Sequence, residues 1–173
     1  MKITKKLVIL GSGSIGMEAL WVAEDMNRAA TCDVTWDILG FGDDNPNRKG
    51  EKVQGYDVLG TSEELVDKLD KDIWFHCAIG NNASRALVAE FIKSRGFSGA
   101  TLIHPSGVFE KSAKVGEGSY IGAGSIVAPM ASIGDFVLIN TLAGIGHHSV
   151  IGDYAQICPG AKINGNCKVG RLA

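Results

Sequence analysis

From Ile103 to Val169, an apolar residue returns at every sixth position of the chain. The twelve positions are Ile103, Phe109, Val115, Ile121, Val127, Ile133, Ile139, Ile145, Ile151, Ile157, Ile163 and Val169. A second series, two places before each of these and running from Gly107 to Cys167, is almost entirely small. Neither an α-helix nor a single strand has this period. A fixed hexad with turn residues between apolar ones predicts short strands stacked into a parallel β-helix, with the sixth-position side chains inside.

Three hexads close one triangular coil, so a residue and the one 18 positions later are expected to lie in neighbouring coils. The repeat continues to Ala173, which lies two residues into a hexad, and no capping segment follows. A solenoid needs a cover over each end of its core. We therefore expect a β-helix domain over residues 101–173 that is incomplete or covered by another chain.

The first hundred residues have a different pattern, in which strands and helices alternate. Apolar runs at residues 7–10, 37–41 and 73–79 indicate three strands. Three helices are expected: one directly after the first run, one that begins at Thr61 or Ser62, and one over residues 83–94. Alternation of this kind is typical of βαβ units with a parallel sheet. The sequence predicts a Rossmann-like half-domain over residues 1–100, joined to the β-helix near residues 96–99.

Net charge, hydropathy and cysteine spacing limit the classes of partner and the cellular compartment that we expect. The net charge of the 173-residue chain is −2, which gives no reason to expect a nucleic acid or an anionic membrane as partner. The apolar run after Lys5 and Lys6 is too short for a signal peptide or a membrane span. Four cysteines without C-x-x-C spacing are typical of free thiols in a reducing cytosol and argue against a zinc site. We expect a cytoplasmic protein.

The glycine-rich turn Gly11-x-Gly13-x-x-Gly16 stands between a strand and a helix. Such a turn lets the backbone approach a phosphate at a helix N-terminus, although the glycines could equally serve only a tight turn. The acidic pair Asp43-Asp44 lies beyond the spacing of about twenty residues that a dinucleotide site requires. The second nucleotide-binding half is also replaced by the hexad repeat, so one nucleoside diphosphate fits better than a dinucleotide.

Polar residues follow two further strands at their carboxyl ends. Asp43-Asp44 follows the second strand, and Gly80-Asn81-Asn82 with Arg85 follows the third. Because the carboxyl ends of parallel strands share one edge of a sheet, where ligands bind, we expect these loops to converge with the glycine-rich turn. The alternatives are an ordinary Asp-rich turn and, for Arg85, a solvated helix residue.

His147 and His148 lie between the interior positions Ile145 and Ile151, near a corner of a coil. An unpaired imidazole is costly in an apolar prism, so at least one ring should point outward. Histidine is the natural general base near neutral pH. The alternatives are an exposed pair without a role and a metal site, but adjacent histidines diverge and seldom share one metal ion.

Taken together, these motifs resemble the hexapeptide-repeat sugar acyltransferases of the sialic-acid O-acetyltransferase and UDP-amino-sugar N-acetyltransferase type. The resemblance is carried along the whole chain by Gly-Phe-x-Asp-Asp, Ala-Ile-Gly-Asn-Asn-x-x-Arg, Ile-His-Pro-Ser and Ile-Gly-His-His-x-x-Ile-Gly-Asp. It implies a left-handed β-helix, a role in glycan biosynthesis, and a homotrimer with acetyl-CoA between neighbouring β-helices and no metal. The residues implied are His147 as the base, beside His148; Gln156 and Gly165 at acetyl-CoA; and, at the nucleotide-sugar, Gly13, Ser14, Asp43, Asp44, Gly80, Asn81 and Arg85.

Three departures from the family pattern limit what the resemblance implies. Relatives carry a histidine in the glycine-rich turn, where this chain has Ser14 and the residue after it. They carry an acidic residue at the position of His148 and a histidine at the position of Gln156.

From the resemblance as a whole we expect an acetyltransferase acting on the amine or hydroxyl of a nucleotide-linked or sialic-acid-type sugar. The alternative is a nucleotide-sugar-binding trimeric scaffold that lacks a complete coenzyme A site.

Overall fold

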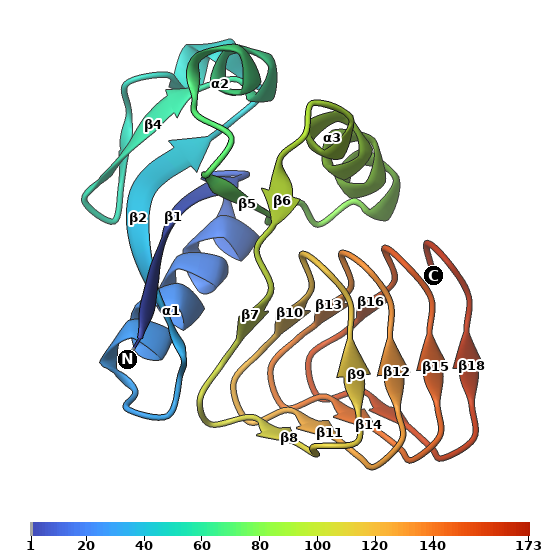
Figure 1. The fold of residues 1–173 in the computed structure, drawn as a ribbon. Helices are drawn as coiled ribbons and strands as arrows, with labels where there is room; N and C mark the ends of the chain where they lie inside the picture. Colours follow the sequence, from blue (N-terminus) through green and yellow to red (C-terminus); the bar gives the residue numbers. More distant parts are fainter. Residues whose placement is uncertain (1) are drawn as a thin grey trace.

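The computed structural model describes residues 2–173, which form an α/β part followed by a triangular prism of coils (Figure 1). The α/β part contains β1 (Ile3–Leu10), α1 (Ser14–Arg28), β2 (Val34–Gly42), the 3₁₀ turn η1 (Pro46–Arg48), β3 (Lys52–Val53), β4 (Tyr56–Gly60), α2 (Ser62–Lys68), β5 (Trp74–Cys77), α3 (Asn82–Ser94) and β6 (Ser98–Gly99).

The strands of the α/β part form one sheet in the order β3-β4-β2-β1-β5-β6. All neighbours are parallel except β3 and β4, which form a hairpin. The central strand β1 is apolar and fully buried over residues 7–10, because both of its faces are covered. The predicted Rossmann-like arrangement is thus confirmed, while the hairpin and the short strand β6 at the joint are additions that the sequence did not predict.

The prism has three faces, each a parallel sheet of four two-residue strands. The first face consists of β7 (Leu102–Ile103), β10 (Tyr120–Ile121), β13 (Leu138–Ile139) and β16 (Gln156–Ile157). The second consists of β8 (Val108–Phe109), β11 (Ile126–Val127), β14 (Gly144–Ile145) and β17 (Lys162–Ile163). The third consists of β9 (Lys114–Val115), β12 (Ser132–Ile133), β15 (Val150–Ile151) and β18 (Lys168–Val169). The predicted left-handed β-helix is confirmed.

Neighbouring coils are in an 18-residue register, as the hexad repeat predicts. Tyr120 pairs with Leu138, and Leu138 pairs with Gln156. The sixth-position aliphatics fill the prism interior. Buried serines of the small series tie the coils together, since the Ser119 and Ser149 hydroxyls donate to carbonyls 15 residues further on, at 2.8 and 2.7 Å. The interior is therefore held by aliphatic packing and by hydroxyls that find acceptors there.

From Gly118 on, one residue in each hexad turns the corner with a positive φ. The series is Gly118, Gly124, Met130, Phe136, Leu142, His148, Tyr154, Gly160, Asn166 and Leu172. Left-handed backbone is uncommon in residues other than glycine, yet here the coil geometry imposes it on large side chains. From Gly118 on, this corner backbone is therefore found in glycine and in large side chains alike.

The two parts of the chain meet through Arg85 of α3, whose side chain is fully buried. Its guanidinium donates to the carbonyl oxygens of Phe136 at 3.0 Å, Tyr154 at 2.6 Å and Ile79 at 2.6 Å. Phe136 and Tyr154 are equivalent corners of successive coils, and their rings stack with centroids 5.8 Å apart. Burial lowers the pKa of Arg85 to about 10, so the side chain stays charged at neutral pH and joins two coils to the sheet.

Replacing Arg85 by methionine is expected to destabilise the protein strongly. Buried carbonyls that lose their donor cost about 1–3 kcal/mol each, so Arg85→Met should lower the free energy of unfolding in urea by at least about 3 kcal/mol. The matched control is Arg95→Met, because Arg95 follows the same helix but is half exposed, with its guanidinium beside exposed Asp67 and over the Phe91 ring; it should cost less than about 1 kcal/mol. Equal losses in the two variants would contradict the role of Arg85 at the joint.

Candidate active site

A groove of about 510 Å³ opens at the carboxyl edge of β1, β2 and β5. Its walls come from the turns after these three strands and from α3. The residues that line it include Gly11, Ser12, Gly13, Asp43, Asp44, Asn45, Arg48, Ser62, Ala78, Ile79, Ser84 and Val88. The structure thus brings the glycine-rich turn together with the acidic pair, at the edge where open α/β sheets bind their ligands.

The three glycines of the turn have two different roles. Gly11 has a φ of +101°, and a Cβ there would lie 2.6 Å from the Ala78 carbonyl oxygen; a Cβ on Gly16 would collide with the Gly11 carbonyl. These two glycines allow close packing. A Cβ on Gly13 would meet nothing within 4 Å. Gly13 is the N-cap of α1; no side chain caps the helix there, and the first turn contains no acidic residue. The first N–H groups of α1 are therefore free to bind an anion.

Asp43 is fixed on one side of the groove by its hydrogen bonds. It accepts from the backbone N–H of Ser12 at 3.1 Å, from the Ser12 hydroxyl and from the Asn45 N–H at 3.0 Å, while Arg48 lies 3.4 Å away. Burial raises the pKa of Asp43, but the donors from Ser12 and Asn45 and the Arg48 charge outweigh it and hold the pKa below its ordinary value. Asp43 is thus an ionised acceptor beside a cation.

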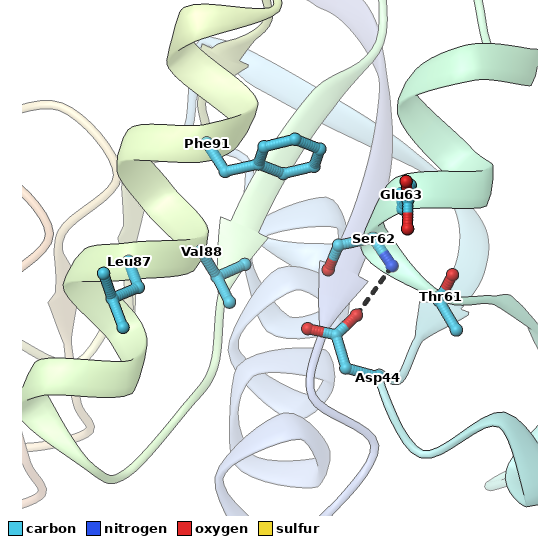
Figure 2. Close-up of a pocket in the computed structure, with 7 residues that line it drawn as sticks. All are labelled: Asp44, Thr61, Ser62, Glu63, Leu87, Val88 and Phe91. Atoms are coloured by element: carbon cyan, nitrogen blue, oxygen red, sulfur yellow. Dashed lines mark hydrogen bonds between the residues drawn. The ribbon is translucent and has the colours of Figure 1, made fainter.

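Asp44 lies between this groove and an adjoining hollow of about 490 Å³ formed by the start of α2 and by α3 (Figure 2). Its Oδ1 accepts from the backbone N–H of Ser62 at 2.8 Å. Thr61 forms the predicted N-cap of α2, completed by a capping box with Glu64. The opposite wall is apolar and consists of Leu87, Val88 and Phe91 of α3 (Figure 2). The hollow therefore has a carboxylate on one side and an apolar wall on the other.

A third hollow, of about 500 Å³, lies where the α/β part meets the last coil. It is lined by Gly80, Asn81 and the first residues of α3 on one side and by Gln156 and Cys158 on the other. Asn81 is the N-cap of α3 and accepts from the Ser84 N–H at 2.9 Å. Residues that the sequence assigned to the nucleotide-sugar and to acetyl-CoA thus face one common space.

Two residues predicted at the nucleotide-sugar, Arg85 and Ser14, line neither the groove nor the two hollows beside it. Arg85, which the sequence placed at the nucleotide-sugar or in solvent, is buried in the joint, and its guanidinium is taken up by backbone carbonyls. Ser14 is exposed at the first residue of α1 and does not line the groove. The groove is lined instead by two residues that were not predicted, Ser12 and Arg48. Arg48 could not be predicted because an arginine in a polar turn has no distinguishing sequence pattern.

His147 and His148 are both exposed on the corner between β14 and β15. Their Nδ1 atoms are 3.2 Å apart, and the rings are nearly perpendicular. The His147 ring lies against Gly165, where a Cβ would come within 2.6 Å of its Nε2. The structure therefore groups three of the predicted residues at one corner and leaves an imidazole open to solvent.

Within one chain, this corner and the groove lie on different sides of the prism. The α/β part packs on the first face and on the corner between the third and first faces, through α1 against β7 and through Arg85. The histidines occupy the corner between the second and third faces, opposite the first face (Figure 1). A ligand in the groove of a chain is thus separated from the histidines of that chain.

Within residues 2–173, no group of three or more His, Cys, Asp or Glu side chains is placed to hold a metal ion. No helix in the same range is long and apolar enough to cross a membrane.

A glycine-rich turn on an α/β sheet, followed by a hexapeptide β-helix that carries an exposed histidine, is the arrangement of a sugar acyltransferase of the hexapeptide-repeat class. Comparison with known proteins agrees. The PglD N-terminal domain family matches residues 6–92, and the bacterial transferase hexapeptide family (six repeats) matches residues 130–165. The chain belongs to the hexapeptide-repeat sugar acetyltransferases that carry a PglD N-terminal domain, as its motifs suggested.

The relatives include proteins of known activity. GDP-perosamine N-acetyltransferase of Escherichia coli O157:H7 is 32% identical over 157 residues, which are 91% of this chain and 69% of that protein. WeeI from Acinetobacter baumannii AYE superposes with a TM-score of 0.80 at 24% identity, over 97% of this chain and 76% of that one. PerB from Caulobacter crescentus, solved with CoA and GDP-perosamine, superposes with a TM-score of 0.59 at 21% identity, over 96% and 86%. These two structures share the fold.

The hydrogen bonds of Asp43 predict a pH-dependent contribution to stability. Because the folded-state pKa lies below the ordinary value of 3.8, this contribution is present above about pH 4 and is lost as the pH falls through the lower folded value. The difference in unfolding free energy between the wild type and Asp43→Asn should therefore be largest near neutral pH and shrink in acid. Urea unfolding of both proteins from pH 7 to pH 3 measures it, and a difference independent of pH would contradict the assignment.

Proposed function

We propose that the protein transfers the acetyl group of acetyl-CoA to the amine of a nucleotide-linked amino sugar, with GDP as the first carrier to test. The observation that carries the proposal is the groove, in which an open turn at Gly13 and the free N–H groups of α1 face the ionised Asp43. The relative at 32% identity is an N-acetyltransferase of GDP-perosamine, which supports an amine acceptor and a GDP carrier. The protein is proposed to act in the cytoplasm, in glycan biosynthesis.

The groove accommodates the nucleotide-sugar in one direction. The diphosphate would bind the N–H groups of Ser14 and its neighbours at the start of α1, with Arg48 opposite. The base and ribose would extend toward Asp44 and the apolar wall of α3. The sugar would then point toward Gly80 and Asn81, the side on which the α/β part meets the last coil. This order places the reactive sugar at the end of the groove that is nearest to the β-helix.

His147 would act as the general base. As the sugar nitrogen attacks the thioester carbonyl, its proton passes to Nε2 of His147. The new C–N bond and the tetrahedral oxyanion form together, and backbone N–H groups would stabilise the oxyanion. The intermediate then collapses by breaking the C–S bond, and His147 returns its proton to the thiolate of CoA. Gln156 and Gly165, with His148 beside the base, would lie along the donor.

A homotrimer would complete the site. Because the histidines and the groove of one chain lie on different sides of the prism, the base must come from a neighbouring chain. The second face exposes apolar side chains that a neighbour would cover. Val108 and Ile126 lie one above the other on this face, and Leu142 and Met130 stand at its two corners, each about half exposed or more. Exposed apolar patches of this kind mark protein interfaces.

Removing the imidazole should abolish transfer without loss of acceptor binding. His147→Ala is expected to lower kcat by roughly 10²–10⁴, the contribution of a positioned general base. CoA release with GDP-perosamine measures the rate, and calorimetry measures the affinity for that sugar. Lys52→Ala, on the exposed hairpin of β3 and β4 and outside both the groove and the second face, is the control for a surface change and should keep most of the activity. Full activity of His147→Ala would refute the assignment of the base.

A site shared between chains predicts complementation. Asp43→Asn removes the acceptor side and His147→Ala removes the base, so each homotrimer alone should be nearly inactive. Chains carrying one change each, co-expressed with different tags and purified as mixed trimers, should regain part of the wild-type activity, because some interfaces then combine two intact halves. A chain carrying both changes, mixed with His147→Ala, is the control that regains nothing. Mixed trimers without activity would place both halves of the site in one chain.

A further inference from the structure

We propose that His148 is a positioning residue for His147: its Nδ1 accepts the Nδ1–H of His147 and so keeps the lone pair of His147 on Nε2. This inference rests on the proposed function, because Nε2 is the atom that takes the proton from the sugar amine. It gives His148 a role that the neutral side chain itself can perform, without the negative charge of an acidic neighbour.

The contact between the two rings requires one shared proton. The Nδ1 atoms are 3.2 Å apart, and the ring planes meet at 86°. Two lone pairs at this distance would repel each other, and two N–H groups would do the same, so one Nδ1 donates and the other accepts. In a neutral imidazole, the hydrogen bond made by one nitrogen decides which tautomer is present. A proton on Nδ1 of His147 leaves its Nε2 free to act as a base.

The coil backbone holds the acceptor in place. His148 turns the corner with a φ of +59°, and its N–H donates to the Pro129 carbonyl of the preceding coil at 3.1 Å. Met130 occupies the equivalent corner 18 residues earlier, with a φ of +61°. A methionine therefore adopts the same corner backbone as His148, so the side chain at 148 can be changed to methionine without changing the corner.

The coil also holds His147. Its carbonyl accepts from the Asn166 N–H at 2.8 Å, and its ring lies against the bare Cα of Gly165. Within residues 2–173, no hydrogen bond or ion pair joins either imidazole to a carboxylate. His148 is consequently the acceptor that the structure offers to Nδ1 of His147.

The test compares two substitutions at the same corner. His148→Asn keeps an acceptor, since its side-chain oxygen can take the Nδ1–H, and asparagine tolerates left-handed backbone. His148→Met removes the acceptor and copies the residue found one coil earlier, so it is expected to fold; His148→Leu, which copies Leu142, is the second variant of that kind. Nitrogen-15 NMR of the imidazoles in the protein without substrates reports the tautomer of His147, and steady-state kinetics reports kcat and KM.

The wild type and His148→Asn should show a proton on Nδ1 of His147 and a free Nε2, whereas His148→Met and His148→Leu should lose this preference. In the same two variants kcat should fall about tenfold, a part of the roughly 10²–10⁴ that a general base contributes, with KM unchanged. His148→Asn should keep the kcat of the wild type. An unchanged tautomer in His148→Met would overturn the proposal whatever the activity. A tautomer shift in a protein that transfers no acetyl group would instead uphold the pairing and count against the proposed function.

Discussion

The 18-residue register of the coils is the constraint on which the rest of the structure depends. It stacks the corners of Phe136 and Tyr154, so that one buried guanidinium can bind the carbonyls of two coils. It also places Gly165 under the His147 ring and Pro129 beside the His148 N–H. Each of these contacts joins residues one coil apart or links a coil to the sheet. A shift of one residue in the hexad would turn the interior aliphatic side chains outward, and all of these contacts would be lost.

The joint makes the two parts of the chain work as one body. Arg85 is supported by Asn82, whose amide donates to the Ala173 carbonyl at 2.8 Å, and by the ion pair of Lys93 with Glu117 at 2.8 Å. The groove is therefore held in a fixed position relative to the coils. Because the histidines of the same chain lie on another side of the prism, we propose that a neighbouring chain supplies the base.

The sequence predicted the features that repeat or that have local causes. The hexad period indicated the prism, the glycine-rich turn indicated the tight connection between β1 and α1, and Thr61 indicated a helix cap. The role of Arg85 could not be read from it, because its acceptors are carbonyls 51 and 69 residues away, and every residue has a carbonyl. Arg48 was missed because its position in the groove depends on a 3₁₀ turn and a short hairpin. Both elements are too short to produce a periodic pattern in the sequence. The separation of His147 from the groove follows from the order of the three faces, which no motif records.

The central claim is that acceptor and base meet across an interface between two chains. The most direct measurement is a crystal structure of the protein with CoA and a GDP-linked amino sugar bound. We expect the diphosphate at Gly13 of one chain, and the sugar amine within hydrogen-bonding distance of Nε2 of His147 from a second chain. A nucleotide-sugar bound in the groove with no histidine of a neighbouring chain at its amine would contradict it.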